Sequence, residues 1–149
     1  MKVYLDLCVY NRPFDDQTQR RIALETMTFL ILLECAIEGN LSVVGSFILD
    51  YENSRNPFDE RRDMIQDLLG VSTEHVDYSE EIEQRASNIE KTGIPAMDAL
   101  HIACAESAST DFFVTCDDIL FRKVRPIHDK FKIKIVHLLD FVTKEVLET

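Results

Sequence analysis

Two acidic residues stand inside apolar segments, where a carboxylate needs a compensating partner. Asp6 interrupts the segment over residues 3–9, which otherwise has the pattern of a buried strand. Asp98 lies in the first turn of an almost wholly apolar helix expected over 96–108, where the helix dipole favours an ionised acid. Taking a carboxylate out of water is costly unless a partner offsets the loss of hydration. These two acids are therefore the firmest candidates for a chemical role.

Two further acids follow strands that the sequence predicts. Glu52 comes after the strand expected over 41–45, and Asp117 directly follows the one expected over 112–115. The carboxyl ends of strands in an open α/β sheet are where ligands bind. Acids that converge there repel one another, and a divalent cation relieves the repulsion. Because hard oxygen ligands select Mg²⁺ or Mn²⁺ over zinc, the acids predict a magnesium or manganese site.

The acids in the apolar segments also have explanations without chemistry. Asp6 can cap a turn, or it can pair with an arginine such as Arg12 or Arg125. Asp98 can serve only as an acid that stabilises the start of its helix. The sequence leaves both explanations open.

The acids that follow strands are open to similar explanations. Glu52 can be a solvated helix residue, and Asp50, two residues earlier, competes with it as a ligand. Asp117 can be a helix N-cap, a position where aspartate is favoured.

Alternating strands and helices must position these acids. Strands are expected over 3–9, 41–45, 73–76, 112–115 and 133–136. Helices are expected over 17–38, 46–54, 59–69, 79–92, 96–108, 117–124 and 139–147. The alternation predicts an α/β fold, a three-layer α/β/α sandwich with a mainly parallel central sheet. The 149 residues suit a single domain over 1–149.

The charge and composition of the chain limit its partners. It has 27 acidic and 16 basic residues and a net charge of −11, so the chain as a whole repels phosphate. Contact with nucleic acid must therefore come from a local basic patch, a bound metal or a partner. The four cysteines lack zinc-ligand spacing and are expected to be small buried residues. The longest apolar run, 29–33, is too short to span a bilayer, so we expect a cytoplasmic protein with no membrane association.

Four short segments, taken in order, resemble the PIN domain family, in particular its small bacterial VapC-like ribonucleases and toxins. The segments are Tyr4-Leu5-Asp6, then Ser46 with Glu52 six residues later, then Asp98-Ala99-Leu100-His101-Ile102-Ala103, and finally Val114-Thr115-Cys116-Asp117. The resemblance covers essentially the whole chain. No single motif is specific, but the ordered set is fairly specific.

The resemblance implies a metal-dependent endoribonuclease that hydrolyses RNA phosphodiester bonds through a centre of Mg²⁺ or Mn²⁺. Asp6 and Asp98 would be the principal ligands, Glu52 and Asp117 would be ligands or organise them, and Thr115 would position the fourth acid. Many small bacterial members are toxins neutralised by an antitoxin, and members often dimerise. The resemblance therefore also implies an RNA substrate, an antitoxin partner and a homodimer.

The chain departs from the family pattern beside the first acid. The family commonly has Thr and then Asn or Ser there, where this chain has Leu7 and Cys8. Polar residues at these positions support the site through hydrogen bonds, and Asn11 and Arg12 can partly replace them from the following loop. His101, three residues after Asp98, is expected to be structural or to lie near the site without chemistry.

Basic residues gather shortly after the fourth acid. Arg122, Lys123 and Arg125 can meet substrate phosphates, or they can form an ordinary solvated helix face. Asp118, beside Asp117, leaves the identity of the fourth ligand ambiguous.

Two other functions compete with that of a ribonuclease. The net charge of −11 and the Leu7-Cys8 pair favour a binding or regulatory module of PIN fold that cuts weakly or not at all. A receiver-like signalling domain also uses acids at strand ends. The sequence lacks the strand-end lysine of such domains, which counts against this function.

Overall fold

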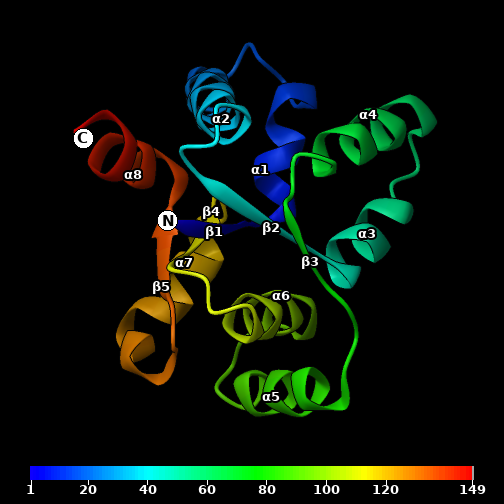
Figure 1. Cartoon of the computed structure of the whole chain (residues 1–149), viewed down its shortest axis with the longest axis vertical. Helices are drawn as coiled ribbons and strands as arrows, with labels where there is room; N and C mark the ends of the chain where they lie inside the picture. The colour runs from blue at the N-terminus through cyan, green and yellow to red at the C-terminus, as the bar shows by residue number, and fades with distance from the viewer. Residues whose placement is uncertain (149) are drawn as a thin grey trace.

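A sheet of five strands forms the centre of the molecule, seen in a computed structural model that describes residues 1–148 (Figure 1). The strands are β1 (Lys2–Leu5), β2 (Ser42–Ser46), β3 (Glu74–Val76), β4 (Phe112–Thr115) and β5 (Lys134–His137). Their order is β3-β2-β1-β4-β5, and every neighbouring pair is parallel. The prediction of a mainly parallel sheet is confirmed.

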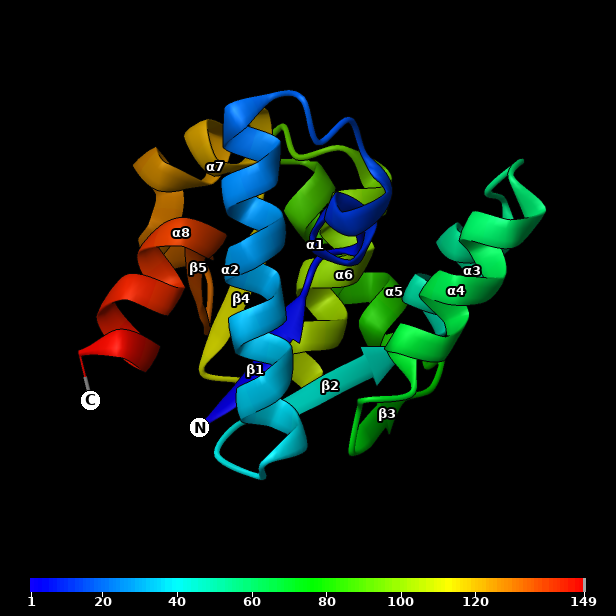
Figure 2. The same ribbon diagram turned by 90° about the horizontal axis from the view of Figure 1, so that it is seen from above.

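Helices cover both faces of this sheet. They are α1 (Leu7–Asn11), η1 (Arg12–Phe14), α2 (Arg20–Ile37), α3 (Phe47–Ser54), α4 (Asp59–Leu69), α5 (Glu80–Glu90), α6 (Ala96–Ser107), α7 (Asp118–Val124), η2 (Arg125–Lys130), α8 (Leu138–Phe141) and η3 (Val142–Leu147). Figures 1 and 2 show α1, α2 and α4 on one side of the sheet and α5 and α6 on the other, which confirms the three-layer sandwich. Within residues 1–148, none of the helices combines the length and apolar character needed to cross a membrane.

Strands β1 and β4, which are neighbours in the sheet, are almost wholly buried. Val3, Tyr4 and Leu5 of β1 and Phe113 and Val114 of β4 have no exposed surface. A parallel strand covered on both faces is apolar on both sides, which explains these continuous apolar runs. The rings of Tyr4 and Phe113 stack with their centroids 5.4 Å apart and join the two strands in one core.

The chain reverses its direction across the sheet between β1 and β4. It runs from β1 outward through β2 to β3, and then returns to add β4 and β5 on the other side of β1. Loops that leave neighbouring strands at such a point diverge and open a crevice at the carboxyl ends of the strands. Asp6 and Asp117 follow β1 and β4, so the topology brings both acids to this crevice.

The strand expected over 3–9 is wrong in its second half. Strand β1 ends at Leu5, and Asp6 caps the short helix α1 by accepting a hydrogen bond from the Leu7 N–H at 2.8 Å. A short apolar run has no periodicity that separates a strand from a buried helix, so the pattern did not reveal the break. The remaining predicted elements lie within about three residues of their observed bounds, as such boundaries commonly do.

Gly45 of β2 lies against the loop before β3, and replacing it with alanine tests this packing. An added Cβ would lie 2.9 Å from Ser72 Oγ and 3.2 Å from Ser72 Cβ. We expect Gly45→Ala to lower the free energy of unfolding by about 1–3 kcal/mol, measured by urea denaturation. Ser42→Ala, in the same strand, should cost less. An unchanged or increased stability of Gly45→Ala would show that the predicted steric conflict does not occur.

Candidate metal centre

Asp6 is buried at the end of β1, with only 6% of its surface exposed. Its N–H donates to the Val114 carbonyl at 2.9 Å, which ties the residue to β4. One carboxylate oxygen accepts from Leu7 N–H at 2.8 Å, and the other accepts from the Thr115 hydroxyl at 2.8 Å. Burial raises the pKa of Asp6, whereas His101 and the Thr115 hydrogen bond lower it and Glu52 raises it. The fold thus holds an acid where ionisation is unfavourable without further positive charge.

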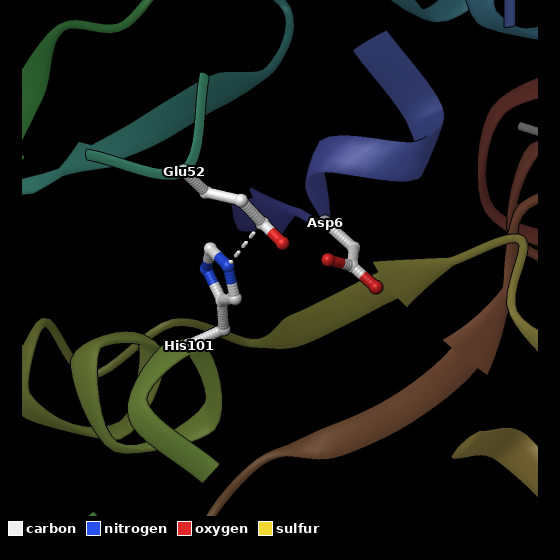
Figure 3. A group of neighbouring side chains, drawn as sticks. All are labelled: Asp6, Glu52 and His101. Atoms are coloured by element: carbon white, nitrogen blue, oxygen red, sulfur yellow. Dashed lines mark hydrogen bonds and ion pairs between the residues drawn. The ribbon is translucent and has the colours of Figure 1, made fainter. Parts of the chain in front are cut away.

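Glu52 reaches the same place from α3. This helix begins after Ser46, whose hydroxyl accepts from the Leu49 N–H at 3.2 Å. Oε1 of Glu52 lies 2.9 Å from Nε2 of His101. Figure 3 shows the Glu52 carboxylate lying between Asp6 and His101.

A buried chain of hydrogen bonds stands behind Glu52. Nδ1 of His101 lies 2.7 Å from the Tyr4 hydroxyl, which lies 2.7 Å from the Ser46 hydroxyl. If Nε2–H of His101 donates to Glu52, Nδ1 accepts from Tyr4 and the Tyr4 oxygen accepts from Ser46, so that every group has a partner of the right kind. His101, only 1% exposed, is then a residue that orients Glu52.

Sequence reasoning missed this chain. The sequence predicts His101 to be structural or near the site without chemistry, and Tyr4 enters only as part of a motif. Two signals were available: His101 lies three residues after Asp98 and so on the same side of α6, and Tyr4 places a polar hydroxyl inside a buried strand.

Asp98 is electrostatically coupled to the other acids. It lies in the first turn of α6 and is half-buried. Burial raises its pKa to about 6, with further increases from Asp6, Asp117 and Glu52, opposed by His101. An influence of three carboxylates on one pKa requires that they lie near it. The negative charges of Asp6, Glu52 and Asp117 therefore form part of the electrostatic environment of Asp98.

Asp117 is a helix N-cap and also faces this environment. Its Oδ1 accepts from the N–H groups of Ile119 and Leu120 at 2.9 and 3.1 Å, as the structural explanation predicted. Its own N–H donates to Thr115 Oγ1 at 3.0 Å, and the same hydroxyl donates to Asp6. Thr115 thus joins the first and fourth acids directly.

The donor groups fit a hard divalent cation. One ligand atom each from Asp6, Glu52 and His101 lie within 4.8 Å of one another. Asp98 and Asp117 do not belong to this compact group, but their charges add to it. Because both ring nitrogens of His101 are engaged by Glu52 and Tyr4, the available ligand atoms are carboxylate oxygens, which suit Mg²⁺ or Mn²⁺. Asp6 and Glu52 are the residues best placed to hold the metal.

The two competing acids are engaged elsewhere. Oδ2 of Asp50 lies 2.9 Å from His75 Nε2 on the neighbouring strand. Asp118 forms a bidentate ion pair with Arg21 at 2.6 and 2.7 Å. In the structure, therefore, Glu52 rather than Asp50 faces Asp6, and Asp118 is tied to α2 by Arg21.

Among residues 1–148, no hydrogen bond or ion pair joins Asp6 to Asn11, the last residue of α1, or to Arg12 of η1. The Asn11 side-chain oxygen accepts from Arg61 at 2.8 and 3.1 Å. Arg12 pairs with Asp15 at 2.8 Å and with the buried Glu25 at 3.5 Å, so the suggested Asp6–Arg12 pair is not present. These contacts fasten the loop after α1 to α2 and α4 and leave its arginine charge neutralised.

Cys8 takes part of the supporting role instead. Its Sγ lies 3.4 Å from Asp6 Oδ2 and 3.5 Å from Thr115 Oγ1, and it accepts from the Cys116 N–H at 3.3 Å. The expectation that the cysteines serve only as small buried residues is therefore wrong for Cys8. A thiol is a weak donor, so it supports Asp6 less than the hydroxyl or amide of the family pattern would.

Arg122 lies on α7, and its side chain does not join the acids. Its Nε donates to the carbonyl of Asp118 at 3.3 Å, and its side chain is exposed. No contact between Arg122 and the four acids is found among residues 1–148. The neighbouring Arg125 is also exposed and does not pair with Asp6.

The pKa of Asp98 predicts how its substitution changes stability with pH. A folded-state pKa of about 6, against an ordinary 3.8, means that the folded protein loses stability as the pH rises through this window. In a chelator, Asp98→Asn should raise the free energy of unfolding at pH 7.5 by about 1 kcal/mol, a value reduced for partial solvent exposure. The gain should shrink near pH 4.5, as urea denaturation would show. The exposed Asp63→Asn serves as control, and a gain independent of pH would contradict the coupling.

Comparison with known proteins agrees with this architecture at the level of the fold. No family model and no curated protein sequence matches the chain. A solved structure, VapBC2 from Rickettsia felis bound to a DNA fragment from its promoter, contains a chain that is similar with a TM-score of 0.54 and 17% identity. The alignment covers 92% of this chain and 98% of that one. The similarity supports the PIN-like α/β/α fold that the sequence motifs predict.

Proposed function

We propose that the protein is a metal-dependent endoribonuclease that hydrolyses phosphodiester bonds of RNA at this site. The observation that carries the proposal is the meeting of Asp6 and Glu52 beside His101 at the carboxyl edge of the sheet, with ligand atoms within 4.8 Å of one another. The charges of Asp6, Glu52 and Asp117 also raise the pKa of Asp98. A bound Mg²⁺ or Mn²⁺ would activate water and stabilise the leaving oxygen.

The residues of the chain would prepare the site for this chemistry. Thr115 holds one oxygen of Asp6, and His101 holds one oxygen of Glu52. Each carboxylate keeps further accepting capacity for a metal, because a carboxylate accepts about four hydrogen bonds or metal contacts. Groups fixed in this way bind a cation without a further cost in side-chain entropy.

A protein partner is proposed as well, in the manner of a toxin with its antitoxin in the cytoplasm. Helix α2 leaves an apolar stripe exposed to solvent, formed by Leu24, Met27, Leu30 and Ile37 with at least half of each side chain accessible. Contiguous exposed apolar residues commonly mark interaction surfaces. The solved VapBC2 structure, which is similar in fold, supports an antitoxin as the partner, and we propose this stripe as its binding surface. A homodimer is proposed from the family resemblance alone.

A weakly active binding or regulatory module is the second candidate. Three arginines near the carboxyl edge are already paired with acids: Arg12 with Asp15 and Glu25, Arg21 with Asp118, and Arg61 with Asp15. Neutralised arginines attract phosphate less than free ones. The weak thiol support of Asp6 from Cys8 points in the same direction.

Cleavage of RNA tests the proposed activity. The parent protein with Mn²⁺ or Mg²⁺ should cut a mixed RNA substrate, and Asp6→Asn should lower the rate by about 100-fold or more, because metal ligation is lost. Asp63→Asn, at an exposed acid of α4, should retain the parent rate, as gel analysis of the products would show. Cleavage that survives Asp6→Asn would assign the activity to another site or a contaminant. Absence of cleavage by the parent would favour the binding module.

Substitution of Tyr4 tests whether the buried chain positions Glu52. Tyr4→Phe leaves Nδ1 of His101 without its donor, and the dissociation constant for Mn²⁺ should rise by about tenfold, measured by calorimetric titration. Tyr10→Phe, which removes another buried hydroxyl, should leave it unchanged. Equal effects of the two substitutions would mean that loss of stability, not positioning, weakens binding.

A further inference from the structure

The segment over residues 121–134, here called the basic segment, reverses the charge of the molecule locally. It contains six basic residues and one acid, in a chain whose net charge is −11. The segment comprises most of α7, the whole of η2 and the first residue of β5. Its six cations are Arg122, Lys123, Arg125, Lys130, Lys132 and Lys134, and all are exposed.

These cations differ from five of the seven arginines outside the segment. Arg12, Arg21, Arg61, Arg62 and Arg85 each pair with a carboxylate. Across the part of the chain that the structure describes, no ion pair involves any cation of the basic segment. Lys134 instead lies over the Phe112 ring, with Nζ 5.9 Å from its centroid. The segment is thus a positive surface that the protein does not neutralise itself.

An apolar hollow lies within this surface. It has a volume of about 340 Å³, and Phe121, Phe131 and Ile135 are among its lining residues, with Arg125 and Lys134 also contributing. A second hollow of about 190 Å³ shares Phe121, Ile135 and Val136 with it. The two hollows therefore adjoin along β5 and offer successive apolar surfaces, and Asp140, Lys144 and Glu145 also line the second.

The backbone of β5 is free on one side. The strand ends the sheet and pairs only with β4, and Figure 1 shows it at the margin beside η2. The Lys134 N–H donates to the Asp111 carbonyl at 3.3 Å, so Lys134 faces β4. Because backbone groups alternate along a strand, the N–H and C=O of Ile135 face outward. Such an edge can accept a further strand.

We propose that this edge binds an extended, acidic segment of a partner protein, which adds to β5 as a strand. Its acidic side chains would meet Arg125 and Lys134, and its apolar side chains would enter the two hollows. Charge complementarity argues for an acidic occupant. The apolar lining and free backbone edge favour a peptide over RNA, whose recognition rests on phosphate contacts and base stacking. The proposal is independent of RNA cleavage, because the basic segment contains none of the four acids.

Fluorescence anisotropy with a defined probe tests the proposal. The probe is a labelled, end-blocked peptide of eight residues that alternates valine with glutamate. It should bind the parent protein saturably, and the double substitution Arg125→Glu and Lys134→Glu should weaken binding at least about tenfold. The matched control is Arg20→Glu with Lys91→Glu, which reverses two exposed charges elsewhere and should have little effect. A probe N-methylated at every residue keeps its charges but has no N–H to donate from either edge, and should lose binding.

Three results would overturn the proposal. The first is no saturable binding of the probe by the parent. The second is equal binding of the plain and N-methylated probes, or equal weakening by the two double substitutions. The third is that an eight-residue oligouridylate binds in a manner sensitive to the Arg125 and Lys134 substitutions while the peptide does not. That result would make the basic segment a nucleic-acid surface.

Discussion

Repulsion between carboxylates is the constraint on which the rest of the molecule depends. Asp6 is buried at the end of the central strand, and burial, together with repulsion from Asp6, Asp117 and Glu52, raises the pKa of Asp98 to about 6. In the absence of a cation this arrangement opposes folding at neutral pH. The apolar core of β1 and β4, with its stacked Tyr4 and Phe113, is what holds the acids together despite this cost. Stability given up at a site in this way is typical of functional centres.

The surrounding hydrogen bonds determine where the acids point. Thr115 contacts both Asp6 and Asp117, and His101 contacts Glu52 with Tyr4 behind it. Both sets of contacts originate in the buried strands and in α6, which are the rigid parts of the fold. The loop after α1 is fixed separately, by ion pairs of Arg12 and Arg61. The site is therefore built on helices and strands of the core, while the negative charges of its carboxylates have no matching positive charge within residues 1–148.

The sequence predicted those features that depend on local pattern. Apolar runs and caps placed nearly all strands and helices, and the cost of an acid in an apolar segment identified Asp6 and Asp98. The hydrophobic pattern gave a wrong prediction where a strand and a buried helix have the same apolar sequence. Residues 7–9 are apolar enough for a strand, but they form a helix. It also failed for partners far apart in the chain. His101 meets Glu52 across 49 residues, and Arg21 meets Asp118 across 97, and no local spacing reveals such pairs.

Locating a bound Mn²⁺ by anomalous X-ray scattering from crystals tests the central claim most directly. The account predicts a peak with carboxylate oxygens of Asp6 and Glu52 at ligand distances of about 2.0–2.4 Å, and with Asp98 or Asp117 nearby, directly or through water. It also predicts that the peak disappears in Asp6→Asn. A peak outside this group of acids, or one that persists in Asp6→Asn, would contradict the claim that these carboxylates were brought together to bind a metal.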